Sequence, residues 1–216
     1  KLQQPNKHKL SVFEHTPTID LLWKKMKPII LPHIGAFIQH TKCGPPIGLN
    51  PRLRVLRYDA MDDDIFEPHF DATTRVGSTT SLLTVLIYLN DGDGIDFDGG
   101  ETCYLDHHVS STGSSRSSID DTTTIKVVPT TGKVVIFEHD LYHSSVPLKF
   151  GTKYVLRTDV LFEFDANEGD VGVDIPRASD RKIDEVEQQH TVVLCTTLLE
   201  VCQHIKLSDE DKQALD

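Results

Sequence analysis

The middle of the chain, residues 53–164, is a succession of short β-type segments separated by turn residues. The longest, residues 81–90 (SLLTVLIYLN), is an apolar run rich in β-formers, which is typical of a buried strand. Gly- and Asp-rich turns, such as residues 91–94, bound the segments. The predicted strands are residues 53–58, 81–90, 125–128, 134–137 and 154–164. This pattern predicts a mainly β fold, either a barrel or a two-sheet jelly roll.

Helical patterns flank this β region. Residues 18–37 carry apolar side chains at helical spacing, and Pro28 and Pro32 are expected to break or kink that helix. A Gly/Pro loop is expected at residues 43–49. Apolar residues at steps of three and four between positions 180 and 205 predict a C-terminal helix, which would cover the barrel or contact another copy. Residues 110–118 (SSTGSSRSS) predict a flexible inserted loop.

The length of 216 residues fits one domain with a sizeable core. We expect a single domain over residues 1–216, with an N-terminal helical segment and loop (1–49), a jelly-roll core (50–164) and a C-terminal helical extension (165–216). Acidic residues (33) outnumber Lys and Arg (22), for a net charge of −11. This balance argues against nucleic acid as a partner, because a phosphate backbone is bound through positive charge.

Cysteine use and hydropathy bear on the compartment. The four cysteines, Cys43, Cys103, Cys195 and Cys202, form no C-x-x-C pair, so neither a zinc site nor a disulfide framework is predicted. We expect a reducing compartment. The longest apolar runs are much shorter than a membrane span, and no basic-then-apolar leader stands at the start. The prediction is an intracellular protein, cytoplasmic or nuclear, with no membrane partner.

Metal-binding chemistry is indicated by His69 and Asp71. Separated by one residue, they project to the same side of an extended backbone and can reach one metal ion. A third ligand must come from elsewhere, and His143, just after a predicted strand, is the best candidate. His139 is its rival, and we interpret it as a hydrogen-bonded residue at a strand end. Two His and one carboxylate leave three open positions, as in the facial triad of non-haem Fe(II) oxygenases.

Lys153, ten positions after the predicted third ligand, opens an alternating segment in which Arg157 and Asp159 share its face. A buried cation facing inward needs an anion. The distal carboxylate of 2-oxoglutarate would supply one, and Arg157 is the alternative residue for this role. The competing interpretation is that Lys153 or Arg157 is solvated, or pairs with Asp159 or Glu163.

Several motifs, in order, resemble the prolyl 4-hydroxylase-like family of Fe(II)/2-oxoglutarate-dependent oxygenases. They are residues 54–58 (RVLRY), 69–71 (HFD), 81–90 (SLLTVLIYLN), 99–102 (GGET), 129–137 (PTTGKVVIF) and 143–154 (HSSVPLKFGTKY). The resemblance covers roughly residues 50–164, about half the chain. It implies a double-stranded β-helix (a jelly roll, cupin-like), here with flanking N- and C-terminal helices, and a metal near one open end.

The resemblance also implies site roles. It implies Fe(II), 2-oxoglutarate and O2 as reactants, with ascorbate as a further candidate cofactor. His143 aligns with the distal metal ligand, and Lys153 with the basic residue that binds the far carboxylate of 2-oxoglutarate. Tyr58 aligns with a tyrosine that hydrogen-bonds this cosubstrate. Thr102 and Asn90 are candidates for lining the pocket.

The implied activity is hydroxylation of a C–H bond in a peptidyl, prolyl-type substrate, with release of succinate and CO2. The alternatives are the same chemistry on a small metabolite or nucleobase, and a non-catalytic, cupin-like metal-binding protein. Two departures from the family pattern leave the entrance to the site, and hence the substrate, open: residues 59–68 lack the usual Gly, and Ser144 follows His143. A peptide or protein substrate is expected as partner, and the predicted C-terminal helix is a candidate surface for homo-oligomer contacts.

Overall fold

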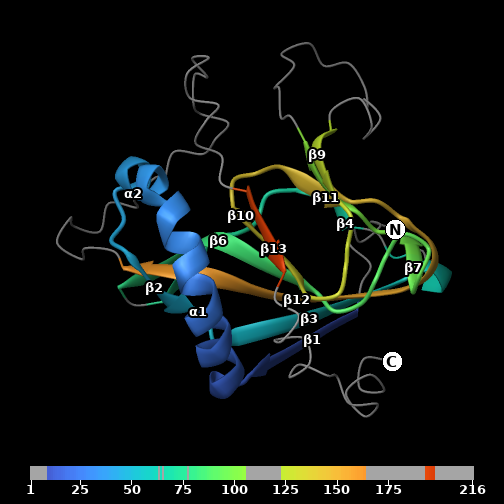
Figure 1. Ribbon diagram of the computed structural model, residues 1–216, viewed down its shortest axis with the longest axis horizontal. Coiled ribbons are helices and arrows are strands. Elements are labelled where there is room, and N and C mark those ends of the chain that lie inside the picture. Colours follow the sequence, from blue (N-terminus) through green and yellow to red (C-terminus); the bar gives the residue numbers. More distant parts are fainter. Residues whose placement is uncertain are drawn as a thin grey trace, which may run out of the picture.

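Two antiparallel β-sheets form the body of the protein in a computed structural model, which describes residues 9–62, 64, 66–76, 78–105, 123–163 and 193–197 (Figure 1). The larger sheet contains β1 (Lys9–Glu14), β2 (Pro46–Leu49), β3 (Arg52–Asp59), β5 (Arg75–Val76), β6 (Thr79–Tyr88), β7 (Phe97–Gly99), β10 (Lys133–Glu138), β12 (Leu148–Glu163) and β13 (Val193–Thr197). The smaller sheet contains β4 (Phe66–His69), β8 (Thr102–Leu105), β9 (Thr123–Val127) and β11 (His143–Ser145). This mainly β, two-sheet architecture confirms the predicted jelly roll.

The order of strands brings segments far apart in the chain together. In the larger sheet it is β1-β3-β12-β6-β10-β13, with β2 and β7 paired to β12 and β5 paired to β6. In the smaller sheet it is β4-β11-β8-β9. The long strand β12 therefore runs between β3 and β6, and it forms the centre of the larger sheet.

The predicted N-terminal helical region is confirmed. It consists of α1 (Thr16–Ile30), the 3-10 turn η1 (Leu31–His33) and α2 (Gly35–Thr41). The side chain of His15 caps α1 by accepting a hydrogen bond from the backbone N–H of Thr18. Pro32 lies in η1, where the α-helix has given way to a 3-10 turn, as predicted. Pro28 lies inside the last turn of α1, and the helix continues past it to Ile30.

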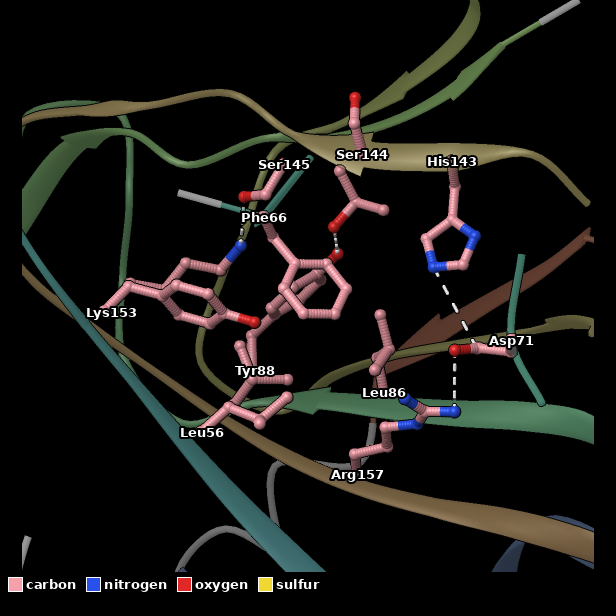
Figure 2. A pocket seen from close by; sticks show the side chains of 13 residues that line it. Leu56, Phe66, Asp71, Leu86, Tyr88, His143, Ser144, Ser145, Lys153 and Arg157 are labelled. Atoms are coloured by element: carbon pink, nitrogen blue, oxygen red, sulfur yellow. Dashed lines mark hydrogen bonds and ion pairs between the residues drawn. The ribbon is translucent and has the colours of Figure 1, made fainter. Parts of the chain in front are cut away.

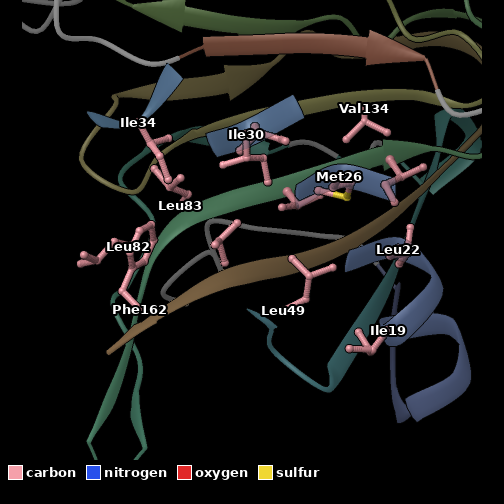
Figure 3. Close-up of a cluster of buried hydrophobic side chains, with 14 of the residues drawn as sticks. Ile19, Leu22, Met26, Ile30, Ile34, Leu49, Leu82, Leu83, Val134 and Phe162 are labelled. Atoms are coloured by element: carbon pink, nitrogen blue, oxygen red, sulfur yellow. The ribbon is translucent and has the colours of Figure 1, made fainter. Parts of the chain in front are cut away.

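A first hydrophobic core joins the helices to the outer face of the larger sheet (Figure 3). Leu22, Met26 and Ile30, at steps of four along α1, are fully buried. They meet alternate residues of the central strands, such as Val85 of β6 and Leu156 of β12. The helices thus cover one face of the sheet and leave its other face for the site.

A second core fills the space between the two sheets. It is built from the remaining alternate residues of the same strands, together with side chains of the smaller sheet. Its members are Leu56, Tyr58, Tyr88, Tyr104, Val127, Val135, Phe137 and Val155. The candidate site opens within this inner layer.

The C-terminal prediction is wrong where the structure describes it. Residues 193–197 form β13, which pairs antiparallel with β10, and they are not helical. This segment reads Val-Leu-Cys-Thr-Thr, in which three of the five residues are β-branched and favour a strand, and the edge of β10 offers N–H and C=O groups for pairing. The rest of the predicted extension, residues 165–192 and 198–216, and the Ser-rich loop at 110–118 lie outside the described residues.

Three smaller points complete the fold. The strand β1 was not predicted, and β2 occupies the last residues of the predicted 43–49 loop. Cys43 and Cys103 are both buried. Among the described residues, no helix combines the length and apolar character that crossing a membrane requires.

Candidate active site

The three predicted metal ligands lie together at one end of the smaller sheet. His69 ends β4 and His143 begins β11, and these two residues are direct partners in the antiparallel register. Asp71 follows two residues after His69, and its backbone N–H donates to the carbonyl of His139 at 2.9 Å. The candidate ligand atoms of the triad all lie within 4.8 Å of one another. Asp71 Oδ1 is 3.7 Å from His69 Nε2, and Asp71 Oδ2 is 3.9 Å from His143 Nε2.

The hydrogen bonds of the two imidazoles suit them to a metal ion. His69 Nδ1 lies 2.8 Å from the carbonyl of Glu67, and His143 Nδ1 lies 2.8 Å from the carbonyl of Leu141. Because a carbonyl can only accept, each Nδ1 carries the hydrogen and each neutral ring keeps its lone pair on Nε2, toward Asp71. His69 Nε2 is buried, with no hydrogen-bond partner in the described part of the chain. These donors fit a divalent metal such as Fe(II).

The ionisation states are also those of metal ligands. Burial alone would raise the pKa of Asp71, but contacts with His69, Arg157, His143 and Thr84 hold it well below its usual range. Burial lowers the pKa of His143 to about 4, against the opposing effect of the Asp71 charge. At neutral pH the site therefore presents an ionised carboxylate and a neutral His143 imidazole, the forms that coordinate metals.

A pocket extends from the triad into the inner layer, and Lys153 lies at its far end (Figure 2). Leu56, Leu86 and Val155 supply apolar walls between the two ends. Figure 2 shows His143, Asp71 and Arg157 on one side of the pocket and Lys153 with Ser145 on the other. The pocket therefore has a metal-binding end and a cationic end.

Lys153 is buried as a cation without a carboxylate partner among the described residues; its side chain is held by neutral groups. Nζ donates to the carbonyl of Gly100 at 2.5 Å and to Ser145 Oγ at 3.1 Å. The ammonium also lies 5.4 Å and 5.5 Å from the ring centroids of Tyr58 and Tyr88, within cation–π range. Burial lowers the pKa of Lys153 to about 7, with a smaller opposing effect from Glu101. A ligand carboxylate would complete this environment.

The other predicted residues separate into two groups. Tyr58 and Thr102 line the pocket, and the Thr102 hydroxyl is 2.7 Å from the hydroxyl of Tyr88. Burial raises the pKa of Tyr58, so its hydroxyl keeps its proton. Asn90 does not line the pocket, which corrects that prediction. Its amide donates to the carbonyl of Thr152 and accepts from a backbone N–H of β12, so it joins two strands.

Arg157 and His139 are placed by their carboxylate partners. Arg157 is not near Lys153: its Nη2 is 2.7 Å from Asp71 Oδ1, at the metal end. The His139 ring is not part of the triad, and its Nε2 is 3.6 Å from Asp159 Oδ1. His139 is buried directly after β10, as expected of a strand-end residue, but neither ring nitrogen makes a hydrogen bond within the described residues, which corrects the predicted hydrogen bonding. Arg157 shares a face of β12 with Lys153 and Asp159, as the alternation predicted, but its choice of carboxylate partner was not predictable.

Sequence reasoning missed three side chains of the site. Thr84 donates its hydroxyl to Asp71 Oδ2, Tyr88 forms a wall of the pocket, and Ser145 accepts from Lys153. A signal was present for the first two. Thr84 and Tyr88 stand four residues apart in the apolar run 81–90, so they share one strand face and are polar members of it, as Asn90 is.

Several solved structures are distantly similar to the chain. A viral collagen prolyl hydroxylase from Paramecium bursaria chlorella virus-1, in complex with 2OG, is 18% identical at a TM-score of 0.46, over 73% of this chain and 80% of that one. A Pseudomonas putida prolyl-4-hydroxylase is 15% identical at a TM-score of 0.47, over 76% and 75%. HygX from Streptomyces hygroscopicus, with nickel, 2-oxoglutarate and hygromycin B bound, is 12% identical at 0.39, over 74% and 74%. No curated protein sequence matches the chain significantly.

Two His and one Asp at the end of a jelly roll place the protein in the class of non-haem Fe(II) oxygenases. Residues 53–158, which contain the triad and Lys153, match the 2OG-Fe(II) oxygenase superfamily. The chain belongs to this superfamily and is a 2-oxoglutarate-dependent dioxygenase. Its metal and cosubstrate are accordingly Fe(II) and 2-oxoglutarate; the involvement of ascorbate stays a prediction.

Proposed function

We propose that the protein hydroxylates a C–H bond of a peptidyl, prolyl-type substrate and converts 2-oxoglutarate to succinate and CO2. In this reaction one atom of O2 enters the C–H bond as a hydroxyl, and the other enters the new carboxylate of succinate. Fe(II) with 2-oxoglutarate, when bound, supplies the activation of dioxygen, which protein side chains cannot provide. The chain's own residues bind and orient the metal and the cosubstrate, and they exclude water.

The observation that carries the proposal is the two-ended pocket. 2-Oxoglutarate has a 2-oxo acid at one end and a second carboxylate at the other. His69, Asp71 and His143 would hold the metal, the 2-oxo acid would bind at that end, and Lys153 would bind the far carboxylate. Tyr58 and Thr102, whose hydroxyl groups lie in the same pocket, are proposed to orient the cosubstrate.

The walls of the pocket serve the chemistry by keeping water out. Leu56, Leu86 and Val155 line the space between the metal end and Lys153. Exclusion of water strengthens the charge–charge contacts of the cosubstrate and protects reactive species from side reactions. The primary substrate would then approach from outside this cosubstrate pocket.

A peptidyl substrate is supported by the ordered motifs that resemble prolyl 4-hydroxylase-like enzymes. A second feature agrees with it: Phe70, between two of the proposed ligands, is 38% exposed and its ring centroid is 4.9 Å from that of Tyr142. Exposed aromatic rings offer flat apolar surface on which a proline ring can pack.

The test is an assay with Fe(II), 2-oxoglutarate and O2 that measures succinate, followed by mass spectrometry of proline-containing peptides for a gain of one oxygen. Asp71→Ala should abolish succinate formation, because it removes the charged ligand. Asp20→Ala, an exposed change on α1, is the matched control and should retain activity. Full activity of Asp71→Ala would reject the triad. Oxygen transfer only to a small metabolite or nucleobase would reject the peptidyl substrate.

A further inference from the structure

The guanidinium of Arg157 contacts a proposed metal ligand and not the cosubstrate end of the pocket. Its Nη2 is 2.7 Å from Asp71 Oδ1, whereas Asp71 Oδ2 accepts a hydrogen bond from the Thr84 hydroxyl. The side chain of Asp71 is 2% exposed, so both contacts are shielded from bulk water. The two oxygens of one carboxylate therefore differ. Oδ1 faces the guanidinium and lies 3.7 Å from His69 Nε2, whereas Oδ2 accepts from the neutral Thr84 hydroxyl and lies 3.9 Å from His143 Nε2.

Arg157 is in turn part of a buried row of charges. Asp159 Oδ1 lies 3.8 Å from Arg157 Nη2, and Asp159 Oδ2 lies 3.1 Å from Arg54 Nη1. Asn50 donates its amide to the same Oδ2 at 3.2 Å. Along the row Asp71, Arg157, Asp159 and Arg54, two carboxylates alternate with two guanidinium groups. The formal charges of these four side chains cancel before any metal ion binds.

We propose that Arg157 is a positioning residue that engages Oδ1 of Asp71, leaves Oδ2 for the metal ion, and makes tight metal binding depend on the dianionic cosubstrate. The inference rests on the proposed function, because it requires that the triad binds a divalent cation and that 2-oxoglutarate binds beside it. It assigns Arg157 a role distinct from that of Lys153, although both project from the same face of β12.

The first reason is the coordination mode of Asp71. A carboxylate can bind a metal through one oxygen or through both. The positive charge of Arg157 beside Oδ1 repels a divalent ion from that oxygen, so binding through Oδ2 alone is favoured. A carboxylate that occupies one position leaves more of the metal's coordination sphere for 2-oxoglutarate and dioxygen.

The second reason is charge balance. Because Arg157 already neutralises Asp71, the carboxylate attracts a divalent ion less strongly than an unpaired buried carboxylate would. Two negative charges arrive with 2-oxoglutarate, and they offset the two positive charges of the metal. Metal and cosubstrate must then strengthen each other's binding by the same factor, since linkage is reciprocal.

The experiment is a calorimetric titration of Mn²⁺ into the full chain, without dioxygen, in the presence and absence of 2-oxoglutarate. Arg157→Gln keeps a hydrogen-bond donor but removes the charge. It should bind Mn²⁺ alone at least about threefold more tightly than the wild type, with a smaller gain from 2-oxoglutarate. Asp159→Asn should act in the opposite direction and weaken binding of Mn²⁺ alone. Without the Asp159 carboxylate, the charge of Arg157 is neutralised by Asp71 alone.

Arg54→Gln is the matched control, because it removes the same charge from the same row without a direct contact to Asp71. Its affinity for Mn²⁺ should stay within about twofold of the wild type. If Arg157→Gln does not fold, the weaker binding of Asp159→Asn together with the near-wild-type control carries the test. Weaker binding in both Arg157→Gln and Asp159→Asn, by equal factors with and without 2-oxoglutarate, would overturn the inference. A wild type that binds no Mn²⁺ would instead contradict the proposed function.

Discussion

Lys153 carries its charge in a place where a charge is disfavoured. Its side chain is almost fully buried between two tyrosine rings, and burial lowers its pKa to about 7. A carboxylate bound at Nζ would favour the ammonium form and raise the pKa again. Between about pH 7 and the raised pKa, the complex with 2-oxoglutarate would therefore hold more protons than the free protein.

This coupling predicts how cosubstrate affinity depends on pH. Below pH 7, Lys153 is charged in both states and the Kd for 2-oxoglutarate should be flat. As pH rises through 7, binding must take up a proton, so the Kd should increase by up to about tenfold per pH unit. Titrations from pH 6 to about 9 in buffers of different ionisation enthalpy would measure both the Kd and the proton uptake.

Lys153→Arg is the control for that prediction. A guanidinium stays protonated throughout this range, so the rise in Kd above neutral pH should disappear. An equal rise in wild type and Lys153→Arg would assign the pH dependence to another group.

The residues of the site were predictable from the sequence to different degrees. His69 and Asp71 share a side of an extended backbone whatever the fold, and the alternation of β12 turns Lys153 and Arg157 inward together. The ion pair between Arg157 and Asp71 was not predictable, because Asp159 was an equally accessible inward carboxylate. Which of the two carboxylates lies closer to Arg157 depends on how β12 is placed relative to the end of β4. That placement is a tertiary property.

At the scale of elements, the turn between β7 and β8 holds the cationic end of the pocket in place. Gly100 adopts a left-handed backbone conformation (φ +73°), and its carbonyl accepts the hydrogen bond from Lys153. A Cβ at this position would lie 2.7 Å from Leu148 Cδ2 and 3.1 Å from Lys153 Cδ. A side chain here would therefore press on Lys153 directly.

Gly100→Ala should raise the KM for 2-oxoglutarate by roughly tenfold, because Lys153 is displaced. Gly94→Ala separates this effect from backbone strain. Gly94 has a similar φ of +82°, but a Cβ there would meet nothing within 4 Å. Backbone strain should cost both variants about 1 kcal/mol of stability, and Gly100→Ala should lose more because its Cβ also clashes with Leu148. A normal KM in Gly100→Ala would show that the turn does not position Lys153.

The helix and strand predictions failed for a common reason. In β13, the periodic apolar pattern suited a helix as well as a strand, and pairing with the edge of β10 decided between them. In β1, the segment Lys9–Glu14 has only partly buried or exposed side chains, so no apolar face in the sequence predicts this strand. Its place is determined by backbone pairing with β3, which a single sequence does not reveal. Strands with a buried face, such as β6 and β10, were predictable because burial imposes a pattern.

At the scale of the whole molecule, the larger sheet separates two layers with different tasks. The layer under the helices contains the first hydrophobic core, whereas the layer between the sheets contains the second core and the site. Stability and chemistry are therefore expected to respond to different substitutions.

Leu22→Ala tests this separation. Leu22 is fully buried under α1, so its truncation should lower the free energy of unfolding by about 2–5 kcal/mol, measured by urea denaturation. The affinity of the folded protein for Mn²⁺ should not change, because the cavity lies on the other side of the sheet. Leu31→Ala, the same change at a residue 42% exposed, should stay within about 0.5 kcal/mol of wild type. Loss of metal affinity in Leu22→Ala would contradict the separation.

The strand β12 has a consequence for how reliably the protein folds. Its odd-numbered residues Lys153, Arg157 and Asp159 face the inner layer, and its even-numbered residues Leu156 and Phe162 face the helices. A slip of one residue against β3 and β6 would exchange the two sets. It would place three ionisable groups in the hydrophobic core between the larger sheet and the helices. Every slip by an odd number of residues carries that penalty, so the side chains that serve catalysis also disfavour half of the possible misalignments of the strand.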